Sequence, residues 1–228
     1  MSTAPPPDNT GHRARLRQRL FEGGPEALLD HELVEYLLAL AIPRRDTKPL
    51  AKALLKEFGG IAGLLTADAA RLAAFPGMGE TSAAAIKTAH AAALRLTQAS
   101  IKDQPVLANW QALLDYLRAD MAHQLTERVR VLHMNSRNML IRDELMSEGS
   151  IDEAAVYVRE VIRRAIDLGS SAIILVHNHP SGDPSPSRAD IDLTRRVQEA
   201  GKKLGIALHD HVIIGTEGHA SLRAMGLI

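Results

Sequence analysis

The run from Ala172 to Val176 (AIILV) is the feature that most restricts how this chain can fold. Five consecutive apolar residues leave no polar face, so we predict a short strand that is buried on both faces. Helical patterns at 156–168 and 187–204 flank the run, and residues 206–214 predict a further strand. A buried strand with helices before and after it is typical of an α/β (α+β) domain.

Two more strands are predicted upstream of this run. Residues 127–134 (ERVRVLHM) alternate in polarity, residues 136–138 offer a turn, and residues 139–144 return as the partner strand. A helical pattern at 109–123 precedes them. Strands and helices therefore mix only in the second half of the chain.

The first half is different, because its pattern from 12 to 97 is helical throughout and is broken only at glycine or proline. A polar stretch that ends in proline (QASIKDQP) follows it, and three consecutive prolines precede it. We therefore predict four segments: a disordered N-terminus at 1–11, an all-helical domain at 12–97, a linker at 98–105 and the α/β domain at 106–228.

Composition limits the chemistry that this chain can perform. The 228 residues include no cysteine, which excludes disulfides, cysteine nucleophiles and thiolate metal sites, so a metal must bind to His, Asp or Glu. The formal net charge is zero, so nothing in the overall charge calls for nucleic acid or an anionic membrane. No apolar stretch reaches about 18 residues, and the polar, proline-rich start is unlike a secretory signal. We expect a cytoplasmic protein with no membrane partner.

The segment HNHPSGDPSPSRAD, residues 177–190, concentrates potential metal ligands. His177 and His179 are two apart directly after the buried strand, so both imidazoles lie on one face of an extended chain. A short loop then leads to a predicted helix that carries Asp190 in its first turn. Two nitrogens and one oxygen, with a fourth position left to water, make up a typical catalytic zinc site. We predict that these three residues bind a zinc ion (Zn2+). Asp183, in the flexible loop, and Asp192, on another face of the helix, are the rival carboxylates.

Simpler explanations exist for each part of this segment. Ser187 and Asp190 have the spacing of a helix capping box, and a His-x-His at the end of a strand is often ordinary surface. The letters HNH also suggest a nuclease, but that architecture spreads its metal-binding residues over a hairpin and a following helix. Here the string follows a buried strand, and one loop delivers three ligand types to one place, which favours the zinc site.

The spacing His-x-His, seven residues, Ser, two residues, Asp matches the signature of the JAMM (MPN+) metalloproteases. Together with residues 148–150, 158–160 and Asp210-His211, the chain from about Pro105 onward resembles the bacterial RadC subfamily. Glu-Gly-Ser replaces the usual Gly-Thr, and no proline precedes Val-Arg-Glu; neither departure touches a predicted ligand. The resemblance implies a JAMM/MPN (cytidine-deaminase-like) α/β fold. The Asp210-His211 pair either orients a ligand or is structural.

The resemblance also implies a mechanism. In JAMM enzymes the two histidines and the aspartate hold zinc and a water, an upstream glutamate accepts the proton of that water, and the serine helps to hold the oxyanion. By order and position, Glu127 and Ser187 match these two catalytic residues. On sequence alone, a glutamate beside Arg128 is typical of a solvated strand edge, and Glu144 and Glu148 are alternatives. The implied function is a zinc metallopeptidase or isopeptidase that hydrolyses an amide bond in a protein or peptide.

Residues 75–86 (FPGMGETSAAAI) resemble a helix-hairpin-helix motif, which RadC-like proteins commonly carry. Gly77 and Gly79 would form a hairpin that aims backbone N–H groups at a DNA phosphate, with Lys87 close enough to help and Glu80 opposed. The simpler explanation is that the glycines only join two packed helices. The alternative function is therefore a DNA-associated repair or recombination protein that binds DNA non-specifically through this hairpin. A zinc-stabilised interaction domain without turnover is a third.

Overall fold

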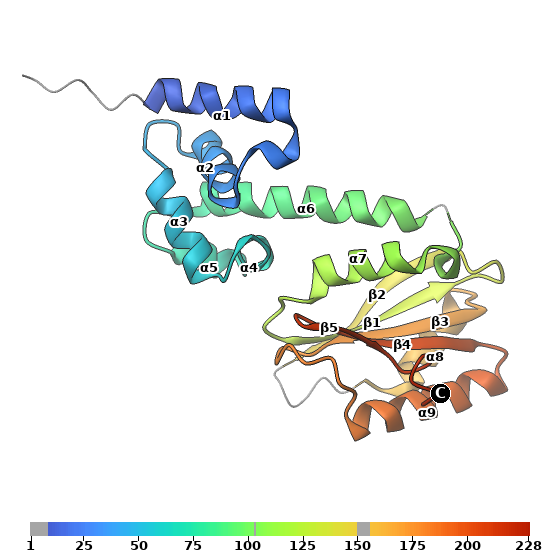
Figure 1. The fold of residues 1–228 in the computed structure, drawn as a ribbon. Helices are drawn as coiled ribbons and strands as arrows, with labels where there is room; N and C mark the ends of the chain where they lie inside the picture. Colours follow the sequence, from blue (N-terminus) through green and yellow to red (C-terminus); the bar gives the residue numbers. More distant parts are fainter. Residues whose placement is uncertain (1–8, 103, 150–155) are drawn as a thin grey trace, which may run out of the picture. The chain divides into compact units, whose positions relative to one another are not determined.

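The chain divides into two compact units, residues 1–92 and 93–228. The computed structural model describes residues 9–102, 104–149 and 156–228 (Figure 1). Of the predicted disordered segment, residues 1–8 lie outside the described residues. Helix α1 (Asn9–Gly23) begins three residues before the predicted boundary. The prolines end at Pro7, so from Asn9 onward every residue has the backbone N–H that a helix needs.

The first unit is helical, as predicted. Its aliphatic core is built from buried leucines and an isoleucine, among them Leu38, Leu54, Leu64, Leu72 and Ile86. Its elements after α1 are η1 (Pro25–Ala27), α2 (Asp30–Ala41), α3 (Lys48–Glu57), α4 (Ile61–Thr66), α5 (Ala69–Ala74) and the start of α6 (Glu80–Lys102). Within the described ranges, no helix combines the length and the hydropathy that a bilayer crossing requires.

The predicted linker at 98–105 is wrong in its first part, because α6 continues to Lys102. Residues 98–102 contain neither glycine nor proline, so nothing local ends the helix there. Ile101 is 1% exposed and belongs to the core of the second unit, which stabilises the added turn. Polarity alone suggested a linker, whereas one buried apolar side chain decided the structure.

The second unit contains a five-stranded sheet with the order β2-β1-β3-β4-β5. Its strands are β1 (Glu127–Met134), β2 (Leu140–Gly149), β3 (Ala172–Asn178), β4 (Ala207–Gly215) and β5 (Gly218–Ser221). Strand β3 lies in the middle, antiparallel to β1 and parallel to β4. The short strand β5 was not predicted, because its sequence GHAS lacks β-forming residues; it forms by antiparallel pairing with β4 across a turn after Gly215.

Helices cover both faces of this sheet (Figure 1). Helix α7 (Trp110–Met121), which follows η2 (Val106–Asn109), packs on one face against Ile174 and Val176. Helices α8 (Val158–Asp167) and α9 (Arg188–Lys203) pack on the other face against Ile173 and Leu175. Every residue of β3 is buried, as the all-apolar run predicted. The predicted architecture, a helical module followed by an α/β domain, is confirmed.

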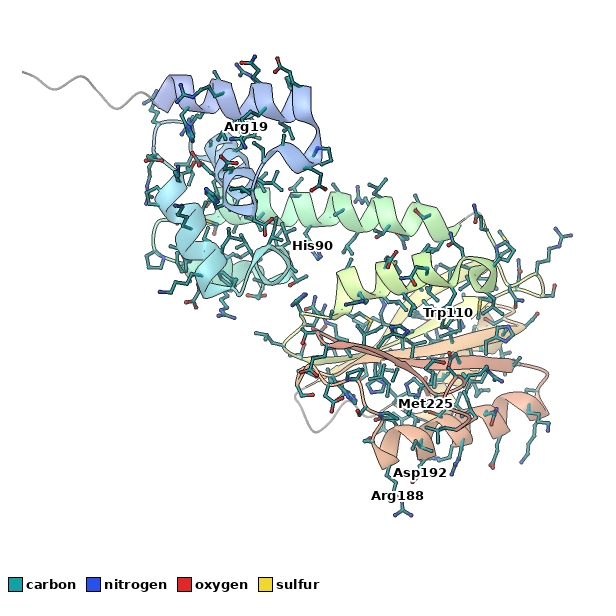
Figure 2. The ribbon with its side chains drawn as sticks, in the orientation of Figure 1. Arg19, His90, Trp110, Arg188, Asp192 and Met225 are labelled. Carbon is teal, nitrogen blue, oxygen red and sulfur yellow. The ribbon has the colours of Figure 1, made fainter. Side chains whose placement is uncertain are left out.

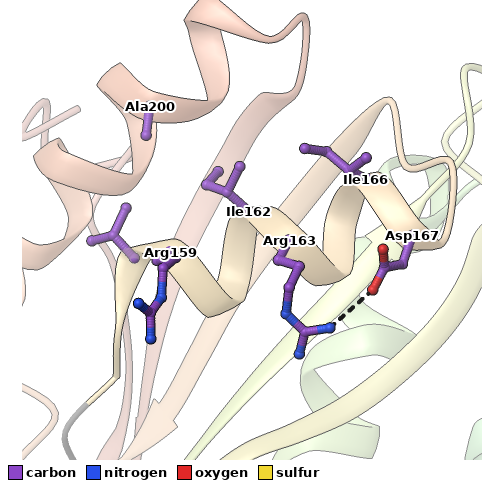
Figure 3. A pocket seen from close by; sticks show the side chains of 7 residues that line it. Arg159, Ile162, Arg163, Ile166, Asp167 and Ala200 are labelled. Atoms are coloured by element: carbon purple, nitrogen blue, oxygen red, sulfur yellow. Dashed lines mark hydrogen bonds and ion pairs between the residues drawn. The ribbon is translucent and has the colours of Figure 1, made fainter.

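A pocket of about 330 Å³ lies between α8 and α9 (Figure 3). Apolar side chains line most of it, with Arg159 and the Arg163–Asp167 ion pair beside them. None of the predicted zinc ligands lines this pocket. Those ligands lie instead around the end of β3 and the start of α9.

Candidate metal centre

Two imidazoles and one carboxylate converge at the end of β3. The ligating atoms of His177, His179 and Asp190 all lie within 4.8 Å of one another. The Nε2 of His177 is 2.9 Å from the Nε2 of His179 and 3.2 Å from Oδ1 of Asp190. The Nε2 of His179 is 3.6 Å from Oδ2 of Asp190. The structure thus brings together the three residues predicted as ligands, while their binding of a metal stays a prediction.

The backbone explains why both histidines reach this point. His177 lies within β3, and the N–H of His179 donates to the carbonyl of Ile214 at 2.9 Å, so the pairing with β4 continues past the strand end. Pro180 then ends the ladder, because it has no N–H to donate. The loop turns at Gly182, whose φ of +93° favours glycine and whose added Cβ would lie 2.5 Å from Oγ1 of Thr216.

The capping box and the ligand cluster exist together at the start of α9. The backbone N–H of Asp190 donates to Oγ of Ser187 at 3.2 Å, and the backbone N–H of Ser187 donates to Oδ2 of Asp190 at 2.7 Å. This cap holds the Asp190 carboxylate beside the imidazoles. The hydroxyl of Ser187 donates to the same Oδ2 at 2.6 Å. Its predicted role at an oxyanion would require that hydroxyl to turn away from Asp190, and it stays a prediction.

The two rival aspartates lie outside the cluster. Asp183 accepts the backbone N–H of Ser185 at 2.9 Å, and its carbonyl oxygen accepts Nδ1–H of His179 at 2.9 Å. Asp183 therefore orients a predicted ligand through its backbone. Asp192 is exposed on the side of α9 that points away from the sheet (Figure 2).

Glu127, the first residue of β1, lies beside the cluster. Val129 pairs with His177 across the antiparallel β1–β3 ladder, so Glu127, two residues away, shares that face of the sheet. Burial raises the pKa of Glu127. Two smaller electrostatic effects act against each other, because His179 lowers this pKa and Asp190 raises it. The strand register and these electrostatic interactions agree in associating Glu127 with the ligand cluster. Its role as a general base stays a prediction.

The alternative glutamates have other partners. Glu144 forms an ion pair with Arg164 at 2.7 Å, and Glu148 forms one with Arg128 at 2.6 Å. The hydrogen bond from Arg164 lowers the pKa of Glu144, which makes it a poorer proton acceptor. The geometry therefore favours Glu127 among the three.

The imidazoles of the site differ in their protonation. Burial lowers the pKa of His177 to about 4 and that of His211 to about 3, so both rings are neutral at pH 7. The nearby Asp190 carboxylate raises the pKa of His179. Burial opposes ionisation of Asp190, but the nearby rings of His179 and His177 bring its pKa below the usual range. Asp190 therefore favours the protonated form of His179, and His179 favours the ionised form of Asp190.

His211 and Thr194 extend the site behind His177, and only His211 was considered in the sequence analysis. The Nε2 of His211 lies 2.8 Å from Nδ1 of His177, so this histidine contacts a predicted ligand. Its neighbour Asp210 accepts the hydroxyl of Ser221 and the backbone N–H of Arg223, which is a structural role. Thr194 was missed by the sequence reasoning. Its hydroxyl lies 2.5 Å from Nδ1 of His211, and its i+4 spacing from Asp190 was the available signal.

Asn178, between the two histidines, was also missed. It is fully buried and points to the opposite face of the sheet. Its Oδ1 accepts the backbone N–H of Arg128 at 2.9 Å, and its Nδ2 donates to the carbonyl of Thr126 at 3.1 Å. These two bonds flank Glu127 on both sides. A polar residue at a position that alternation buries needs partners, and that was the available signal.

In the first unit, the predicted hairpin is present, with Gly77 at φ +90°. Arg45 donates to the carbonyl of Gly77 at 3.1 Å, so a guanidinium lies on the hairpin. The suggestion that Lys87 helps to bind a phosphate is contradicted, because its ammonium donates to the carbonyls of Leu65 and Ala67 at 3.1 and 2.9 Å. Lys87 is used to satisfy backbone carbonyls at the end of α4.

Comparison with known protein families agrees with this division of the chain. The model of the UPF0758 N-terminal family matches residues 9–84, within the first unit. The model of the RadC-like JAB domain matches residues 107–227, which is more than half of the chain. This range contains all five strands of the sheet. The match includes β1, the His177–Asp190 segment and His211. The chain therefore belongs to the RadC family, and its second unit is a RadC-like JAB domain.

Proposed function

We propose that the JAB domain is a zinc-dependent peptidase or isopeptidase. The observation that carries this proposal is the convergence of His177, His179 and Asp190 with Glu127 beside them. The donor set fits zinc, which binds imidazole nitrogen and carboxylate oxygen. Two basic ring nitrogens only 2.9 Å apart also bring their lone pairs together, so a proton or a cation has to lie between them.

When bound at these three residues, zinc would lower the pKa of a coordinated water to about 7 and polarise the amide carbonyl. Glu127 would accept a proton from this water and pass it to the departing amine. Burial raises the pKa of Glu127, which makes its carboxylate a stronger proton acceptor. The Ser187 hydroxyl, once turned from Asp190, donates to the developing oxyanion, an effect commonly worth about 3 kcal/mol.

Metal analysis tests the binding part of this proposal. We expect the purified full-length protein to contain about one zinc per chain, and His179→Ala to lose it. His219→Ala is the matched control, because His219 is exposed on β5 and outside the cluster. Zinc that is absent from the wild type, or that His179→Ala retains in full, would contradict the proposal.

A cleavage assay tests the catalytic part. The wild-type protein is incubated with a library of peptides and isopeptide-linked peptides, and mass spectrometry detects new termini. We expect cleavage that a chelator abolishes, and that Glu127→Gln abolishes while keeping its zinc. Zinc binding without cleavage of any member would instead favour a zinc-stabilised interaction domain.

A second candidate function, DNA binding by the first unit, is supported by the contact between Arg45 and the Gly77 hairpin. An exposed guanidinium on a hairpin of this kind offers a phosphate both charge and backbone N–H groups. Fluorescence anisotropy of labelled duplex DNA at several salt concentrations tests it. We expect an affinity that falls with salt, and a slope reduced by about one in Arg45→Gln. Binding that is absent or independent of salt removes this candidate.

A further inference from the structure

We propose that a buried chain of hydrogen bonds, from His177 through His211 and Thr194 to the backbone carbonyl of Asp190, fixes which nitrogen of His177 carries the proton. His211 and Thr194 are then positioning residues that keep the Nε2 lone pair of His177 directed at the ligand cluster. The structural part of this inference is independent of any metal, and its purpose rests on the proposed zinc function.

Three contacts form this relay. The Nδ1 of His177 lies 2.8 Å from the Nε2 of His211, and the Nδ1 of His211 lies 2.5 Å from Oγ1 of Thr194. The same Oγ1 contacts the backbone carbonyl of Asp190, one helical turn earlier in α9. All three side chains are buried, with Thr194 fully so. Each contact is short enough to require one hydrogen between its two heavy atoms.

The direction of every bond follows from the last contact. A carbonyl oxygen has no hydrogen, so the hydroxyl of Thr194 has to donate to Asp190. That hydroxyl has no second hydrogen, so its contact with His211 uses the Nδ1–H of His211. A neutral imidazole carries one N–H, which leaves the Nε2 of His211 as an acceptor. It therefore accepts the Nδ1–H of His177.

The consequence is a bare Nε2 on His177, the nitrogen that lies 3.2 Å from Oδ1 of Asp190. The opposite tautomer would place a hydrogen there and reverse the two bonds of His211. The hydroxyl of Thr194 would then donate to His211, and Oγ1 would face the carbonyl of Asp190 with no hydrogen between them. Two oxygen atoms would then face each other with their lone pairs in contact, and this repulsion opposes that arrangement.

The ring of His179 is oriented by a shorter route, because its Nδ1–H donates directly to the carbonyl of Asp183. Both predicted histidine ligands are thus oriented by backbone carbonyls. In the case of His177 the relay returns to Asp190, the residue that also supplies the carboxylate. Helix α9 therefore presents one ligand with its side chain and orients another through its backbone.

Nitrogen-15 NMR of the metal-free, full-length protein tests the tautomer. Long-range proton–nitrogen correlation spectra distinguish Nδ1–H from Nε2–H rings, and single His→Gln variants assign the signals. We expect Nδ1–H for both His177 and His211 in the wild type. A His177 ring with Nε2–H would overturn the inference, whatever the protein does with zinc.

Zinc competition with a chromophoric chelator tests the consequence. Thr194→Val removes the hydroxyl but keeps the shape, and we expect zinc affinity to fall by about 10–100-fold, the usual effect of losing a partner behind a histidine ligand. Thr194→Ser restores the hydroxyl, and we expect it to stay within about twofold of the wild type. Wild-type affinity in Thr194→Val would overturn the inference.

The two proposals fail in different ways. A wild-type protein that shows the expected tautomers but binds no zinc would refute the zinc function and support the relay. Circular dichroism and thermal melting of Thr194→Val show whether it folds; if it does not, the tautomers of the wild-type protein decide.

Discussion

Asn178 lies between two predicted ligands, yet its side chain serves the opposite face of the sheet. It bonds the backbone on both sides of Glu127, through the N–H of Arg128 and the carbonyl of Thr126. The three consecutive residues 177–179 at the end of β3 therefore supply both imidazoles and hold the backbone around the predicted base. This arrangement explains how a strand that is otherwise apolar tolerates a fully buried amide.

We predict that Asn178→Ala lowers the free energy of unfolding by about 1–3 kcal/mol, because it leaves a partly buried N–H and a partly buried carbonyl without these partners. Urea denaturation followed by circular dichroism measures this change. Gln198→Ala, at a partly exposed amide on α9, serves as the control and should change stability by less than about 0.5 kcal/mol. A loss in Asn178→Ala no larger than in the control would show that these hydrogen bonds contribute little.

Buried histidines make the stability of the metal-free protein depend on pH. Burial lowers the pKa of His133 and His177 to about 4 and that of His211 to about 3, below the value of about 6.5 in an unfolded chain. Between these values the unfolded chain binds more protons, so stability falls as the pH drops. His179 acts in the opposite sense, because the nearby Asp190 carboxylate raises its pKa.

We therefore predict that the free energy of unfolding of the chelator-treated protein decreases steadily from pH 6.5 toward pH 4. Urea denaturation at half-unit pH steps measures it. His133 lies outside the ligand cluster, so His133→Gln should make the dependence shallower without removing the predicted ligands. A stability that is constant or rises over this interval would contradict the prediction.

The loop between β3 and α9 is positioned by its close contact with the end of β4. A Cβ added to Gly215 would lie 2.0 Å from the carbonyl oxygen of Gly182, a backbone atom that cannot swing aside. The N–H of Glu217 donates to the same carbonyl at 3.1 Å. The β4–β5 turn thus supports the loop that separates the predicted ligands His179 and Asp190.

We predict that Gly215→Ala displaces this loop, lowers stability by about 1–3 kcal/mol and weakens zinc binding. Thermal melting and zinc competition measure the two effects. Gly79→Ala is the comparison, because a Cβ at Gly79 would meet nothing within 4 Å. Equal behaviour of the two variants would show that the contact at Gly215 does not position the site.

The boundary between the two units falls inside the sequence of α6, which starts in the first unit and supplies Ile101 to the core of the second. A boundary placed after Pro105 would therefore remove a core residue from the JAB domain. Burying an isoleucine side chain contributes about 1.5–3 kcal/mol, a large part of the stability of a small domain.

We predict that a fragment of residues 93–228 is more stable than a fragment of residues 106–228, and that Ile101→Ala in the full chain destabilises the second unit by about 2–5 kcal/mol. Urea denaturation of the three proteins checks this. Fragments of equal stability would mean that the last turn of α6 contributes nothing to the second core.

Local patterns were sufficient for much of this protein. The apolar run of β3, the alternation of β1 and the start of α9 after Ser187 each follow from residues that are neighbours in sequence, and the structure has all three. The meeting of His177, His179 and Asp190 was also predictable, because one strand, one short loop and one helix turn separate them.

Features that depend on distant partners were not predictable in this way. Asn178 meets Arg128 across 50 residues, and His177 meets His211 across 34. Ile101 ends up in a core built mostly from later residues, and the sequence GHAS becomes a strand only because β4 offers it a free edge. Periodicity records which face of an element is buried, but it does not record which partner covers that face. Hydrogen-bond direction and side-chain contact are set only when the chain has folded.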